Sequence, residues 1–120
     1  MQYLLLIYND EKEWHALPED DRREVTGRYF GLVEELRRDG TYLGGAPLRP
    51  TAEAKTVTRE TGETLVTDGP FAETKEQLGG YFLVDVGSID EAVAVAARIP
   101  ATDYGRVEVR PIVDVGGPPA

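Results

Sequence analysis

Asp68 and the residues after it are the part of this 120-residue sequence best suited to chemistry. The stretch DGPFAETKEQLGGY begins with Asp-Gly-Pro and ends with a glycine pair and Tyr81. Asp-Gly-Pro is typical of a turn, and proline suits the first position of a helix. We therefore expect one or two turns of helix over 71–77, with Asp68 at the N-terminus, where exposed amides keep a carboxylate ionised.

An ionised Asp68 would act as a general base or as an orienting carboxylate, not as a general acid. The alternative is that Asp68 only caps the short helix and that Phe71 anchors the core, which is the more usual role of such residues. Glu73, Lys75 and Glu76 could line a polar pocket, but a short charged helix more often presents a solvated face.

Two glycine pairs, Gly44-Gly45 and Gly79-Gly80, each lie close to a tyrosine, Tyr42 or Tyr81. Glycine inside a strand lets the backbone approach a ligand, and it equally permits a β-bulge or close packing. The residues expected to bind a ligand in a cleft beside Asp68 are Gly44, Gly45, Gly69, Pro70, Phe71, Gly79, Gly80 and Tyr81.

The sequence favours neither a metal site nor a cofactor. It has one histidine, His15, and no cysteine, and it lacks a metal-binding carboxylate pattern. No glycine-rich nucleotide motif, flavin motif or redox motif accompanies the glycine pairs. Trp14 and His15 could form part of a pocket lid, although packing is the commoner role for such residues.

Composition narrows the classes of partner. The net charge is −9, from 22 acidic and 13 basic residues, and such a surface repels a phosphate backbone, so no direct contact with nucleic acid is expected. No apolar run approaches the ~18 residues of a membrane span, and the start of the chain does not resemble a signal peptide. We expect a cytoplasmic protein with one domain over 1–115 and a flexible tail over 116–120.

Hydrophobic periodicity predicts the elements that position these residues. In chain order, the expected elements are a strand over 3–8, a polar connection over 9–17, a helix over 18–38, a strand over 41–48, a hairpin over 56–67 with Gly62 in its turn, a strand over 81–86, a helix over 89–99 capped by Ser88, and a strand over 107–115. The helix residues expected to face the core are Val25, Tyr29, Leu32, Val33, Leu36, Ala92, Val93, Ala96 and Ile99.

With the hairpin set aside, this order is βαββαβ, an α+β arrangement of the ferredoxin-like type. The helices are expected to cover one face of an antiparallel sheet. Because the strand over 3–8 is apolar on both faces, the other face must be buried as well. A symmetric homodimer would bury it.

The stretch DGPFAETKEQLGGYFLVD resembles the hallmark of the DGPF group within the YCII-related family. The segments MQYLLLIYND, EELRRDGTYLGGAPL, ARIP and VEVRPI are similar to that group too, so the resemblance covers nearly the whole chain. It implies a dimeric α+β barrel of ferredoxin-like protomers.

The resemblance also bears on the site. The broader family has a proposed histidine–aspartate pair in a cleft, with the histidine on the first helix. In this sequence Arg28, Tyr29 and Phe30 occupy that region, and His15 lies before the expected helix. Of the family's presumed site, only Asp68 and its loop can be carried over.

Two functions are consistent with these features. The first is a small homodimeric α+β barrel protein that binds a small organic molecule in a cleft near the DGPF loop, with Asp68 as the base in any proton transfer. The second is a non-catalytic accessory protein that acts through protein contacts. The resemblance implies a link to extracytoplasmic-function sigma factors, and the acidic surface and the hairpin over 56–67 would suit a basic partner.

Overall fold

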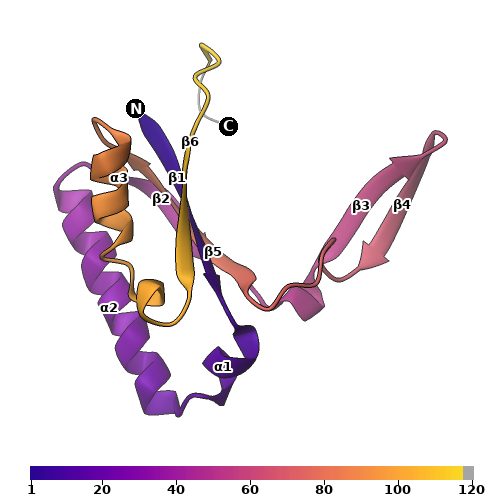
Figure 1. Ribbon diagram of the computed structural model, residues 1–120, viewed down its shortest axis with the longest axis horizontal. Coiled ribbons are helices and arrows are strands. Elements are labelled where there is room, and N and C mark those ends of the chain that lie inside the picture. The colour runs from indigo at the N-terminus through magenta and orange to yellow at the C-terminus, as the bar shows by residue number, and fades with distance from the viewer. Residues whose placement is uncertain (118–120) are drawn as a thin grey trace.

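A computed structural model of the protein describes residues 1–117, so residues 118–120 of the expected tail lie outside the described part. A four-stranded antiparallel sheet carries the helices on one face, and a two-stranded hairpin projects away from it (Figure 1). In chain order the elements are β1 (Gln2–Asn9), α1 (Glu11–Ala16), α2 (Glu19–Arg38), β2 (Tyr42–Pro47), the 3₁₀ turn η1 (Thr51–Glu53), β3 (Lys55–Glu60), β4 (Glu63–Asp68), β5 (Gln77–Asp85), α3 (Ile89–Ala96), the 3₁₀ turn η2 (Pro100–Asp103) and β6 (Arg106–Pro111).

The strand order in the sheet is β2-β5-β1-β6. The two strands at the centre, β5 and β1, are joined through α1, α2, β2 and the hairpin, and each neighbouring pair is antiparallel. With the β3–β4 hairpin set aside, this is the βαββαβ arrangement expected from the sequence, and the predicted α+β fold class is confirmed.

The core lies between the helices and one face of the sheet. Tyr3, Leu5 and Ile7 of β1 are buried, whereas the alternating residues Leu4 and Leu6 are half-buried on the opposite face. A single chain therefore covers one face of β1 and leaves the other partly open to solvent.

The helices contribute to the core nearly as expected. Leu32 and Leu36 of α2 are buried, and Tyr29 and Val33 pack against the same cluster. In α3 the prediction for Val93 is wrong, because Val93 is 50% exposed and Val95 is buried instead. The buried residues Ala92, Val95, Ala96 and Ile99 follow the i, i+3, i+4, i+7 spacing of one helix face.

The predicted hairpin is confirmed as β3 and β4. Its turn contains Thr61 and Gly62, both with positive φ, and the amide of Gly69 donates to the carbonyl of Ala54 at its base. It stands clear of the sheet (Figure 1), and its valines Val57 and Val66 are 63% and 60% exposed. We call this element, residues 55–68, the arm.

The short helix predicted over 71–77 is wrong. Residues 71–76 form bends and irregular backbone, and Gln77 already belongs to β5, where it pairs with Asn9 of β1. Pairing with β1 thus takes the end of the expected helix into the sheet. The remaining segment, 71–76, is too short to form a stable helix unless one face packs against the rest of the protein. Phe71, which would provide that contact, is 89% exposed.

Several other local predictions differ from the structure. The helix expected over 89–99 ends at Ala96, and the strand expected over 81–86 spans Gln77–Asp85. The segment expected as a polar connection contains α1, because the Asp10 side chain accepts hydrogen bonds from the amides of Lys12 and Glu13 and so caps a helix. The last strand ends at Pro111 rather than 115, since its partner β1 begins at Gln2 and offers no residues to pair beyond it.

Candidate functional site

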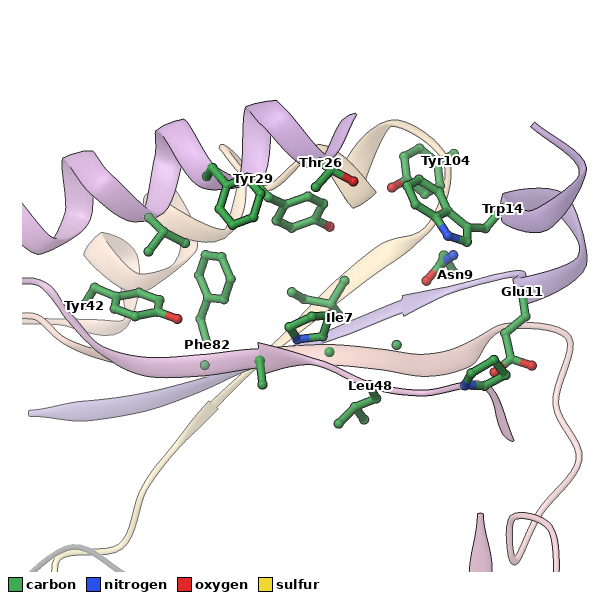
Figure 2. Close-up of a pocket in the computed structure, with 18 of the residues that line it drawn as sticks. Ile7, Asn9, Glu11, Trp14, Thr26, Tyr29, Tyr42, Leu48, Phe82 and Tyr104 are labelled. Atoms are coloured by element: carbon green, nitrogen blue, oxygen red, sulfur yellow. The ribbon is translucent and has the colours of Figure 1, made fainter. Parts of the chain in front are cut away.

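A cavity of about 480 Å³ lies between α2 and the helix-facing side of the sheet. Its middle is apolar and aromatic. Figure 2 shows Tyr29 on the helix above Ile7 and Phe82 on the sheet, with Tyr42 toward one end and Trp14 and Glu11 toward the other. The ring of Phe82 meets Tyr29 and Tyr42 edge to face, with centroids 6.3 and 5.3 Å away.

Helix α1 provides the polar end of the cavity. Glu11, Trp14 and His15 all line it, and their spacing places them on one side of the helix. Trp14 stacks on Tyr104 with ring centroids 6.5 Å apart. The sequence analysis considered Trp14 and His15 for a pocket lid, and both border the cavity. The capping Asp10 and the acidic first turn of α1 were the signal for this helix.

Glu11 connects α1 to the segment that follows β2. Its carboxylate accepts two hydrogen bonds of 2.8 Å, from the amide and from the hydroxyl of Thr51, while its own amide donates to the Gln77 side chain at 3.0 Å. Both carboxylate oxygens of Glu11 are therefore engaged in holding the structure. His15 also lines this end of the cavity from an exposed position, and an imidazole can both donate and accept a proton.

Tyr29 and Tyr104 border the cavity where α2 approaches the turn before β6. Burial is the main cause that raises the pKa of Tyr29, and the neighbouring Tyr104 raises it further. Burial also raises the pKa of Tyr104, while its hydrogen bond with Tyr29 and the nearby Arg28 lower it. Both phenols consequently stay protonated at neutral pH, and their hydroxyl groups are hydrogen-bonded to each other.

Replacing Tyr29 with phenylalanine should reduce the loss of stability at alkaline pH. The folded protein keeps the Tyr29 proton at pH values where the unfolded chain, with an ordinary pKa of 10.0, releases it. The folding stability that depends on a protonated Tyr29 is complete below about pH 10 and is lost progressively as the pH rises above this value. Urea unfolding from about pH 8 to pH 11.5 should show a shallower decline in Tyr29→Phe than in the wild type. Equal slopes would contradict this assignment.

Three of the glycines predicted to bind a ligand, Gly45, Gly79 and Gly80, do line the cavity. They also agree with the alternative interpretation, in which glycine permits close packing or a β-bulge. A Cβ on Gly45 would come within 2.5 Å of the Tyr81 carbonyl oxygen, and one on Gly79 within 2.8 Å of Asn9 Oδ1. The pairing of β5 with β1 shifts register beside Gly79, which marks a β-bulge.

The DGPF loop lies outside this cavity. The Asp68 side chain is 87% exposed and pairs with Lys55 at 2.6 Å at the base of the arm. The predicted site residues that do not line the cavity of their own chain are Gly44, Asp68, Gly69, Pro70, Phe71 and Tyr81. Tyr81 precedes Phe82 in β5 and so points to the opposite face of the sheet. A catalytic role for Asp68 stays a prediction, without support from the cavity of a single chain.

Two further features concern metals and membranes. Within residues 1–117, no cluster of three or more histidine, aspartate or glutamate side chains is arranged to hold a metal ion. None of the helices in this described part combines the length and apolar character that a membrane crossing requires.

Comparison with known proteins places these features in a family. The family model of the YCII-related domain matches residues 1–116. An uncharacterized protein of Rhizobium meliloti (strain 1021) is 42% identical over 117 residues, and the match covers 93% of this chain and 92% of that protein.

A solved structure with the same fold is 5-chloro-2-hydroxyhydroquinone dehydrochlorinase from Burkholderia phenoliruptrix AC1100, in complex with 2,5-dihydroxybenzoquinone. Its TM-score is 0.54 at 16% sequence identity, and the alignment covers 94% of each chain. At this identity the likeness supports the fold alone.

Proposed function

Because the chain belongs to the YCII-related domain family, we propose that it uses the family fold to bind a small ring-shaped organic molecule in the cavity between α2 and the sheet. The observation that carries the proposal is the cavity itself, about 480 Å³ and walled by aromatic side chains with a few polar groups at one end. Ligand sites in proteins have this size and this mixture of groups.

The aromatic walls favour a ring. Tyr29 and Phe82 contact each other edge to face and present aromatic surface to the cavity, and aromatic side chains bind planar rings through stacked and edge-to-face contacts. The dehydrochlorinase with the same fold is described in complex with a quinone, which agrees with a ring-shaped ligand.

Any proton transfer in this cavity would use His15. Glu11 lines the same end, but its carboxylate oxygens already accept hydrogen bonds from Thr51. In His15→Gln, turnover of a substrate should fall by about 10²- to 10⁴-fold, the usual contribution of a general acid or base. An unchanged kcat in this variant would remove His15 from the mechanism and leave only a binding role for the cavity.

Filling the cavity should abolish binding. Thr26 lines it from an exposed position on α2, so Thr26→Trp adds a large ring without disturbing the core. We expect hydroquinone or 2,5-dihydroxybenzoquinone to bind the wild type and to lose at least about tenfold in affinity in Thr26→Trp, measured by titration calorimetry. Glu24→Trp is the matched control, because Glu24 is exposed on the same helix and does not line the cavity. The proposed function is wrong if neither compound binds the wild type, or if Thr26→Trp and Glu24→Trp bind the compound equally well.

We further propose that the protein is a homodimer assembled through the uncovered face of the sheet. On that face Leu4 lies opposite Leu83 and Leu6 opposite Tyr81, forming an apolar surface across the two central strands. A two-fold pair would cover this surface with an identical one. The arm would then have a neighbouring protomer to contact, which its exposed valines favour together with the exposed Phe71 that follows the arm.

An accessory role through contact with another protein is the alternative, and the exposed apolar side chains of the arm are the observation in its favour. It is distinguished by a pull-down with the purified protein at low salt, repeated with the double variant Val57→Ser, Val66→Ser. A partner retained by the wild type and lost by the variant would support the accessory role. If no protein is retained, the accessory role is wrong, and any contact of the arm is with another copy of this chain.

A further inference from the structure

Arg37 stands at the end of the cavity that is farthest from α1. Its guanidinium carbon lies 5.2 Å from the centre of the Tyr42 ring, and both residues line the cavity. Of the lysine and arginine side chains in residues 1–117, Arg37 alone lines it. The neighbouring Arg38 does not, and it pairs with Glu34 at 3.0 Å.

Arg37 also differs from most arginines of this chain in its charge environment. Within the described residues, no carboxylate lies within ion-pair distance of its guanidinium, although acidic residues outnumber basic ones by 22 to 13. The Tyr42 ring supports one face of the planar group, which leaves the N–H donors around its edge available. Such donors match a carboxylate, which can accept two parallel hydrogen bonds.

The cavity is elongated between two different ends. Its lining on α2 extends from Thr26 to Arg37, a rise of roughly 16 Å at about 1.5 Å per residue. Tyr42 marks one end and Trp14 and Glu11 the other, with the aromatic middle between them (Figure 2). A ligand that occupies the whole cavity is therefore longer than one ring and meets a cation at one end and α1 at the other.

We propose that the ligand is an elongated aromatic acid. Its carboxylate binds Arg37 above the Tyr42 ring, its ring lies in the aromatic middle of the cavity, and a polar substituent faces His15 and Asn9 at the α1 end. This inference rests on the proposed function, because it specifies the class of ring compound that the same cavity takes.

The test compares one acid with its uncharged analogue. The probes are 4-hydroxycinnamate and 4-hydroxycinnamide, which share their ring and length and differ in the charge of the end group. A charge-assisted hydrogen bond should make the wild type bind the acid about tenfold to a hundredfold more tightly than the amide at low salt. In Arg37→Gln the acid should bind no better than the amide, while amide binding stays within about twofold of the wild type.

Arg38→Gln is the matched control. It removes the same charge one residue away, outside the cavity, and should keep the preference for the acid. Three results would overturn the inference: equal binding of acid and amide by the wild type, equal loss of acid binding in Arg37→Gln and Arg38→Gln, or loss of amide binding in Arg37→Gln. If Thr26→Trp still abolishes binding in these cases, the proposed function stands without this ligand class. If neither probe binds the wild type, the inference fails, and the titrations with hydroquinone and 2,5-dihydroxybenzoquinone decide separately whether the proposed function stands.

Discussion

Leu5→Ala should lower the free energy of unfolding by about 2–5 kcal/mol, the range for truncating a buried leucine. Leu5 is fully buried in the central strand β1, opposite Phe82 of β5 and Val109 of β6, so neighbouring side chains cannot close the gap without moving the sheet. Urea unfolding followed by circular dichroism would measure the change.

Val93→Ala is the control for this prediction. Val93 is half exposed on α3, on the side of the helix away from the core, so its truncation should change stability by less than about 0.5 kcal/mol. If Val93→Ala costs as much as Leu5→Ala, the orientation of α3 described above is wrong and the core extends to the helix face expected from the sequence.

Leu6→Glu should convert the proposed homodimer into a folded monomer. In each protomer the new carboxylate would be buried in the interface beside Glu108 of the neighbouring strand, and the nearby Arg110 is already paired with Glu108. An unpaired buried charge typically costs about 3–5 kcal/mol, and a two-fold interface contains it twice. We therefore expect dimer dissociation to become easier by well over about a hundredfold.

Light scattering after size exclusion would test this directly. The wild type should elute with twice the mass of one 13.2 kDa chain, and Leu6→Glu with the mass of one. Val93→Glu adds the same charge to the helix-covered side and should remain dimeric. A monomeric wild type would exclude the proposed dimer, and a dimeric Leu6→Glu would move the interface to another surface, such as the arm.

Several parts of the fold followed from local sequence. The helix predicted over 18–38 was evident because its apolar residues recur at helical spacing between acidic and basic turns, and it is observed as α2. The hairpin was evident because Gly62 provides a positive φ angle in its turn. These features depend on residues within a few positions of one another, so a pattern along the chain is enough to identify them.

The candidate site was predicted only in part. The glycine pairs predicted either a backbone that approaches a ligand or a bulge and close packing, and Gly45, Gly79 and Gly80 do border the cavity. The sequence analysis missed the two ends of the cavity, because Arg37 stands in the last turn of α2, where a cation is common, and because α1 was expected as a polar connection. Their meeting around one cavity depends on how α2 crosses the sheet, which no local pattern specifies.

The sequence by itself determined the βαββαβ order with its inserted hairpin, most of the apolar helix faces and the α+β class, because periodicity and turn chemistry act over short distances. It did not determine α1 or the irregular backbone over 71–76. Only the tertiary structure decided which chemical groups share the cavity. Pairing of Gln77 with Asn9 drew the start of β5 into the sheet and left Asp68 exposed beside Lys55. The packing of α2 on the same sheet, with α1 following the end of β1, brought His15 and Arg37 to opposite ends of one aromatic cavity.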